Sequence, residues 1–275
     1  MKKSLMLLLV FVLVTACANA AWAAPVAVGV APNKIDVGFN FKGADLSVSG
    51  TVPEGSDVYV KVASPFDSVL QLNKKGRVGP FWMNVENVDV TAVPKLYQVF
   101  SSAPLGNLPP DLSQQYGLTP GFDPVYQNAL VAKHGEEGSA RLGQREANVY
   151  VDSLVNIYQK SGLYAVKENS AMVNGSRFEV NVQLPPNIPQ EDCEVTVYAV
   201  NNGVLVDQQS VSLPVGSVGL LSWLNHEAVY DGPNYGFMAV LIALVFGTGI
   251  ALLFGYLESL ITGDKTVGLD AGAGH

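Results

Sequence analysis

The chain has 275 residues, of which 48% are hydrophobic and 15% charged, and its formal net charge at pH 7 is −8. A chain with this acidic balance is not expected to bind nucleic acid. The most hydrophobic stretches lie near the two ends, which leaves fewer than about 200 residues for a body of one large or two small domains.

Residues 1–23 have the three-part plan of a secretory signal peptide: two lysines, an apolar run of ten residues, and then small residues up to Ala23. Ten apolar residues are too few to cross a bilayer. Cleavage after Ala23 would remove both lysines and leave a mature net charge of about −10. The residues before Cys17 also resemble a bacterial lipobox, in which the cysteine is lipidated, so two routes of processing are open.

Residues 24–102 alternate apolar and polar side chains in short runs such as DVYVKVAS and FWMNVENVDV. Period-two alternation that is rich in Val, Tyr and Leu indicates half-buried strands. We expect turns at Pro53–Ser56, Lys74–Gly76 and Glu86-Asn87. The spacing predicts an immunoglobulin-like β-sandwich region.

Residues 103–162 are predicted to form a loop followed by an inserted helical hairpin. Asp123-Pro124 is typical of a helix start, and we expect that helix to end near His134. A second helix is expected from about Arg145 to Lys160, with Gly162 after its C-terminus. The apolar face of the second helix is expected to hold Ala147, Tyr150, Val151, Leu154 and Tyr158.

Strand patterns resume in residues 163–215, where Asn201-Asn202-Gly203 predicts a tight hairpin turn. These strands either complete the first sandwich or form a second one, and the sequence leaves both arrangements open. Residues 216–235 predict an amphipathic juxtamembrane segment.

Residues 236–257 contain no charged side chain and, as a helix, would extend about 33 Å, enough to cross a hydrocarbon core of about 30 Å. Tyr235 and Tyr256 lie at its ends, as interfacial aromatic residues do. These features favour a transmembrane helix over a buried core helix. A signal peptide followed by one span predicts a type I protein of the bacterial inner membrane, with the body in the periplasm and residues 258–275 as a cytoplasmic tail.

Small residues recur at intervals of four along the predicted span and would share one face of the helix. Such a face lets another helix backbone approach closely, either from a second copy or from a polytopic membrane protein. The predicted helix-packing face consists of Ala239, Ala243, Gly247, Ala251 and Gly255.

The chain offers few residues for catalysis, and we expect neither an enzyme nor a bound cofactor or metal. His134 with Glu136 and Glu137 could form part of a metal site, but a solvated charged loop is the favoured interpretation. If Cys17 leaves with the signal peptide, Cys193 has no disulfide partner within the chain. We expect it to be a small buried residue of a strand and not a redox centre.

Several motifs resemble the putative transmembrane protein family first named from alphaproteobacteria. They include GPFWMN from Gly79 to Asn84, VFSSAPL from Val99, RFEVNVQLPPNIP from Arg177 and VGLLSWL from Val218. The resemblance covers nearly the whole mature chain, although the tail here is acidic where the family has an arginine-rich end. It implies a membrane-anchored extracytoplasmic protein without an established biochemical activity, often found beside permeases of the sulfite-exporter type.

The resemblance also draws attention to Trp82, Asn84, Pro94 and Tyr97, either as a shared surface or as a structural turn with a packed tryptophan. We expect an accessory protein that associates with an inner-membrane transporter. The alternative is a periplasmic ligand-binding or adhesion module that the span merely tethers.

Overall fold

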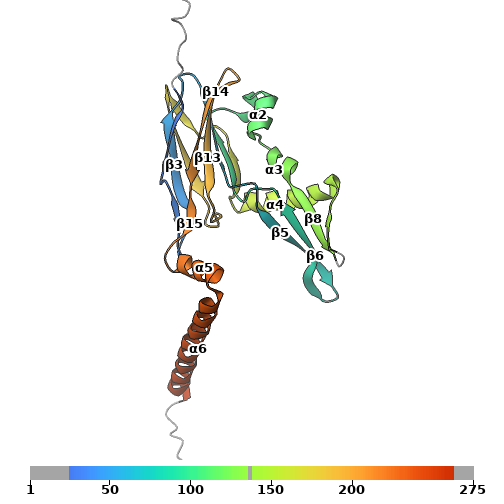
Figure 1. Cartoon of the computed structure of the whole chain (residues 1–275), viewed down its shortest axis with the longest axis vertical. Helices are drawn as coiled ribbons and strands as arrows, with labels where there is room; N and C mark the ends of the chain where they lie inside the picture. The colour runs from blue at the N-terminus through green and yellow to red at the C-terminus, as the bar shows by residue number, and fades with distance from the viewer. Residues whose placement is uncertain (1–24, 136–137, 263–275) are drawn as a thin grey trace, which may run out of the picture. The chain divides into compact units, whose positions relative to one another are not determined.

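The structure is a computed structural model that describes residues 25–135 and 138–262 (Figure 1). It divides into two units, one through Ser217 and one from Val218 onward. The prediction of a mainly β chain with one C-terminal apolar helix is confirmed. The immunoglobulin-like detail stays a prediction.

The first sheet of the β unit has four antiparallel strands in the order β1-β3-β12-β11. Strand β12 alternates exposed and buried residues along its whole length, as a strand with one face on a core does. The strands are β1 (Ala27–Ala31), β3 (Ala44–Thr51), β11 (Met172–Asn174) and β12 (Arg177–Leu184).

The second sheet has five strands in the order β10-β7-β4-β13-β14, in which only the pairing of β10 with β7 is parallel. Asn202 and Gly203, both with positive φ, connect β13 to β14, which confirms the predicted hairpin turn. The strands are β4 (Asp57–Ala63), β7 (Tyr97–Ser101), β10 (Tyr164–Lys167), β13 (Cys193–Asn201) and β14 (Val204–Leu213).

Strands from the two halves of the sequence share both sheets. In the first sheet β12 pairs with β3, and in the second β13 pairs with β4. The strands after residue 163 therefore complete the sheets begun by the strands before residue 102, which answers the question that the sequence left open. A short parallel pair, β2 (Ile35–Val37) with β15 (Val215–Ser217), joins the two ends of this unit.

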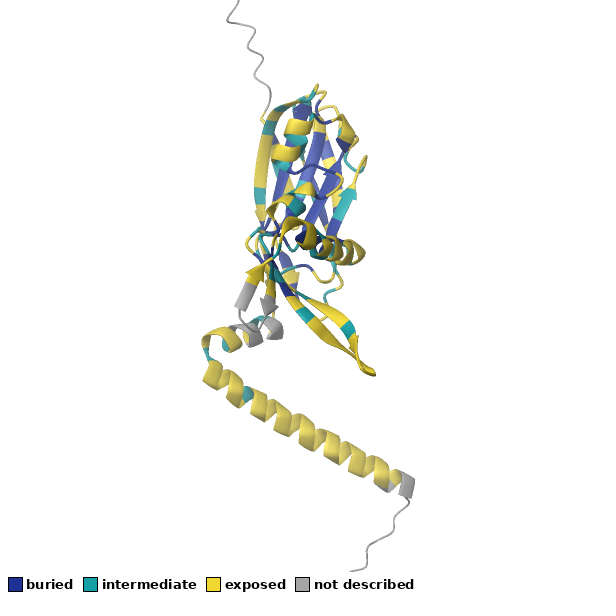
Figure 2. Ribbon diagram, turned by 90° about the vertical axis from the view of Figure 1, so that its right-hand side faces the viewer, coloured by how far each residue is buried: buried dark blue, intermediate teal, exposed yellow. Residues whose placement is uncertain are grey.

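A core rich in valine, leucine and tyrosine side chains fills the β unit. Figure 2 shows in dark blue the strand segments whose residues are buried. Leu46 and Val48 of β3 and Val60 of β4 are fully buried. One face of β7 packs on this core. Its opposite face carries Tyr97, whose ring contacts those of Phe122 and Tyr164 at centroid distances of 6.2 Å. Strand β7 is thus covered on both faces, which explains why all five of its residues are buried.

A third sheet, in the order β5-β6-β8-β9, contains strands that were expected in the sandwich. The turns expected at Lys74–Gly76 and Glu86-Asn87 are wrong, because both lie inside paired strands; a register shift between Lys74 and Lys75 takes the place of the first, and the true turn is Gly79-Pro80. The strands are β5 (Val69–Val78), β6 (Phe81–Thr91), β8 (Leu130–Gly135) and β9 (Gly138–Arg141).

The segment between the sandwich strands holds the 3-10 helix η1 (Leu105–Asn107) and the helices α2 (Pro110–Tyr116), α3 (Asp123–Asn128) and α4 (Gln144–Lys160). The prediction of a helix to His134 is wrong: α3 ends at Asn128, because the residues from Leu130 onward pair with β6. A β-hairpin therefore lies between α3 and α4.

Helix α4 confirms the second predicted helix. It buries Ala147, Val151 and Leu154 as expected, and Gly162 follows it with a φ of +77°. Tyr150 and Tyr158 are half-buried against the core.

The second unit contains α5 (Leu220–Tyr230) and α6 (Gly232–Thr262). Residues Gly232–Glu258 of α6 form a helix long and apolar enough to cross a membrane, and none of its most apolar stretch is buried within the structure. The helix begins four residues before the predicted start. The predicted signal peptide and most of the predicted tail lie outside the described residues.

Candidate interaction surfaces

The distal half of the β5–β6 hairpin, Lys75–Val85, extends as a two-stranded ribbon, and we refer to it as the arm (Figure 1). Strand β8 pairs with β6 only from Val88 to Thr91, so within the described residues no third strand pairs with the arm. Every residue of the arm is exposed apart from the half-buried Gly76.

The two faces of the arm differ in chemistry. Directly paired residues of antiparallel strands share a face, so the pairing of Val78 with Phe81 and of Gly76 with Met83 builds one apolar face. Val85 extends that face across Gly76, because a Cβ atom at position 76 would lie 2.8 Å from the Val85 methyl carbons. The apolar face therefore consists of Val78, Phe81, Met83 and Val85, whose exposed fractions are between 50% and 70%.

The opposite face of the arm is basic and aromatic. Arg77 pairs with Trp82, and Lys75 pairs with Asn84. Trp82 is 73% exposed, and the guanidinium of Arg77 donates a hydrogen bond from Nε to the Gly79 carbonyl oxygen at 3.1 Å. The arm contains two cations and no carboxylate, in a chain whose net charge is −8.

Glu86 fixes the base of the arm to the rest of the β unit. Its carboxylate accepts hydrogen bonds from Lys133 of β8 and, at 2.7 Å, from the Tyr150 hydroxyl of α4, and it pairs with Lys74 of β5 at 3.3 Å. These donors, Lys133 first, lower the pKa of Glu86 from 4.5 to about 2. The hydrogen bond to the Glu86 carboxylate raises the pKa of the Tyr150 hydroxyl to about 12.

The structure separates the four residues to which the family resemblance drew attention. Trp82 and Asn84 lie on the exposed arm, whereas Pro94 and Tyr97 are buried, Tyr97 with 1% of its surface exposed. The Tyr97 hydroxyl donates a hydrogen bond to the Gly117 carbonyl oxygen, and burial raises the pKa of Tyr97. Trp82 is not packed, and the four residues do not share one surface.

Sequence reasoning missed that Lys75, Arg77, Phe81 and Met83 lie together on one exposed hairpin. The signal was present as a Gly-Pro pair between two alternating runs, which is compatible with a long hairpin. Alternation of apolar and polar residues predicts strands, but it does not indicate which segments cover each face of a strand. The two alternating segments therefore favoured a sandwich over an exposed hairpin.

All five residues of the predicted helix-packing face, Ala239, Ala243, Gly247, Ala251 and Gly255, lie on α6 and are exposed. Gly247 and Gly255 have open space where a Cβ atom would project. The neighbouring Thr248 hydroxyl donates to carbonyl oxygens of its own helix, at 2.6 Å for Leu244 and 3.2 Å for Val245.

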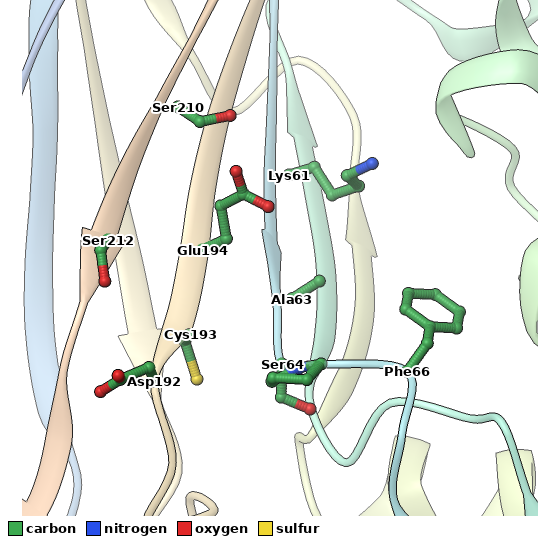
Figure 3. A pocket seen from close by; sticks show the side chains of 10 residues that line it. Lys61, Ala63, Ser64, Phe66, Asp192, Cys193, Glu194, Ser210 and Ser212 are labelled. Carbon is green, nitrogen blue, oxygen red and sulfur yellow. The ribbon is translucent and has the colours of Figure 1, made fainter.

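An open pocket of about 540 Å³ lies along strands β4, β13 and β14 (Figure 3). Lys61, Glu194 and Ser210 line it. The Lys61 amine donates to the Tyr116 carbonyl oxygen at 2.9 Å, and burial lowers its pKa. The pocket thus offers hydroxyl and carboxylate groups, and its one amine already has a partner.

Cys193 lies beside this pocket with 1% of its surface exposed, so the expectation of a buried cysteine in a strand is confirmed. Burial, with the charges of Glu191 and Asp192, raises the pKa of its thiol to about 12. The thiol stays protonated near neutral pH, which disfavours nucleophilic or redox chemistry.

In the described part of the chain, no group of three His, Cys, Asp or Glu side chains is close enough to hold a metal ion. The charged loop considered for a metal includes Glu136 and Glu137, which lie outside the described residues.

The comparisons with known proteins agree with the architecture. A family described as "Putative transmembrane protein" matches residues 25–256, which include both the β unit and most of α6. No curated protein matches the chain. The match covers most of the chain and ends at residue 256, within the apolar helix Gly232–Glu258. The chain therefore belongs to this putative transmembrane protein family.

Proposed function

We propose that this protein is a membrane-anchored accessory protein that associates with a polytopic membrane protein through α6. The observation that supports this most is the exposed line of small residues from Ala239 to Gly255 on a helix long enough to span a bilayer. Small residues at intervals of four let helix backbones approach closely in lipid.

The proposed orientation is type I in the bacterial inner membrane, with the β unit in the periplasm. The signal-like residues 1–23 support this orientation. The family resemblance points to a permease of the sulfite-exporter type as the partner. The proposed role is structural and not catalytic, and it requires no cofactor or metal.

Co-purification in mild detergent tests this association. Gly247→Leu with Ala251→Leu fills the small-residue face and is expected to abolish recovery of the partner without affecting membrane insertion. Val245→Leu with Leu252→Phe adds volume to the opposite face and serves as the matched control. If the complex survives the first pair of substitutions, the proposed contact is wrong.

A second candidate function rests on the pocket of about 540 Å³ beside Glu194, which falls in the size range of small-molecule sites. In this case the protein is a tethered module that binds a polar solute. Thermal-shift measurements on the full chain with a panel of periplasmic solutes test this function. Stabilisation that disappears in Glu194→Ala but persists in Glu54→Ala supports it, whereas the absence of any shift opposes it.

A further inference from the structure

The arm exposes large apolar side chains to solvent, which is unfavourable in water. An isolated two-stranded ribbon is at best marginally stable in water, and this one exposes Phe81, Trp82 and Met83 together at its tip. The contacts of Glu86 with Tyr150 and Lys74 fix the base of the arm, but nothing in the described part of the β unit covers the tip of the arm. An exposed apolar surface of this kind is typical of a site that another molecule or a membrane covers.

The charges of the arm identify the chemistry of that occupant. Lys75 and Arg77 lie on the face opposite to Phe81 and Met83, and no carboxylate lies within the arm. A basic face backed by an apolar face is the arrangement by which peripheral segments bind anionic lipid surfaces. Trp82, on the basic face, has the side chain most typical of the headgroup level.

We propose that the arm binds the surface of an anionic phospholipid bilayer. Phe81 and Met83 enter the boundary between headgroups and acyl chains, while Lys75 and Arg77 interact with lipid phosphates. The inference goes beyond the proposed function, because it requires the anchor α6 but no protein partner.

The membrane anchor makes a weak interaction sufficient. A segment on a chain that already carries a membrane span meets the bilayer at a high effective concentration, so two cations and a few apolar side chains can hold it there.

Trp82 serves as the probe in the full mature chain reconstituted in vesicles. In the mature chain that begins at Ala24, the single substitution Trp223→Phe leaves Trp82 as the only tryptophan. The vesicles contain phosphatidylcholine with brominated acyl chains, with or without phosphatidylglycerol. We expect bromine to quench Trp82 in the vesicles that contain phosphatidylglycerol, and to quench it much less without that lipid.

Lys75→Gln with Arg77→Gln tests the charges. Each cation near an anionic surface contributes about fivefold, so the ratio of quenched to unquenched Trp82 is expected to fall roughly 25-fold. Lys42→Gln with Lys160→Gln, both exposed and outside the arm, is the matched control and is expected to leave the ratio unchanged. Phe81→Ser with Met83→Ser is expected to abolish quenching and leave the circular dichroism of the β unit unchanged.

Three results would overturn the proposal. The first is the absence of quenching in either kind of vesicle. The second is equal quenching in both, which removes any part for the cations. The third is that Trp82 is shielded from water only at a high ratio of protein to lipid and becomes exposed when the protein is diluted in lipid. This result would indicate a second copy of the chain as the occupant. None of these results affects the association tested with Gly247 and Ala251.

Discussion

Strand β7 and the first half of β6 make an instructive pair. Tyr97–Ser101 reads YQVFS, and residues 81–85 read FWMNV. Each stretch has five residues, two of them aromatic, with one valine and one amide. All five are buried in β7, and all five are exposed in β6.

The difference comes from what each strand has for neighbours. Strand β7 pairs with β4 on one side and β10 on the other, while the distal part of β6 pairs only with β5. One face of β7 meets the sandwich core and the other meets Phe122. Amino-acid composition therefore makes a strand favourable in both places, but tertiary contacts alone decide whether its side chains stabilise a core or remain available to a partner.

The largest expected effect tests this difference with phenylalanine on each strand. Phe100→Ala leaves a cavity in the core and is expected to lower the free energy of unfolding by about 3–5 kcal/mol. Phe81→Ala is expected to change it by less than about 0.5 kcal/mol, because the side chain is 70% exposed. Urea unfolding of the detergent-solubilised chain, followed by the circular dichroism of its strands, measures both. Similar losses would show that the arm is packed in solution.

A smaller effect is expected at the Tyr97 hydroxyl. Tyr97→Phe leaves the Gly117 carbonyl without this donor in a buried site, which is expected to cost about 1–3 kcal/mol of unfolding free energy. Tyr126→Phe removes an exposed hydrogen bond to Asp152 and is expected to cost under about 1 kcal/mol. The same urea measurement compares the two variants. Equal costs would mean that water reaches the Gly117 carbonyl.

The smallest effect concerns the base of the arm and its dependence on pH. Because the folded pKa of Glu86, about 2, is below its ordinary value of 4.5, its contacts stabilise the fold above about pH 5 and are lost progressively as pH falls toward 2. At pH 6 the urea midpoint of unfolding is thus expected to be higher for the wild type than for Glu86→Gln. The difference between the two midpoints is expected to be smaller at pH 3. Glu54→Gln is the control for loss of one carboxylate. A gap of the same size at both pH values would contradict the role of the ionised carboxylate.

Local patterns were sufficient for several elements of the fold. The alternation in Arg177–Leu184 and the turn Asn202-Gly203 depend on neighbours close in the sequence, and the structure has both. The apolar face of α4 follows from its helical period in the same way. Elements of this kind are decided by side-chain direction and local backbone preference.

Long-range pairing overruled local signals elsewhere. The sequence predicts a helix from Asp123-Pro124 to about His134, yet the residues from Leu130 onward form β8 because β6 offers hydrogen-bonding partners. Lys74 and Lys75 looked like a turn but form an irregularity inside β5. A one-residue shift in pairing can place charged residues within a strand, and no local preference reports it.

The candidate surfaces show the same division. The line of small residues on α6 could be read directly from a spacing of four, because all its members belong to one helix. The apolar face of the arm could not, since Val85 meets Gly76 only after two strands have paired around a register shift.

The sequence by itself determined that the chain is rich in strands and ends in a helix able to cross a membrane, because period-two alternation and an uncharged apolar segment are local properties. Only the tertiary structure decided that the late strands complete the early sheets, that Tyr97 is buried and that Trp82 is exposed. The physical reason is that burial depends on which distant segments pack against a side chain, and two strands of nearly the same composition can find different neighbours.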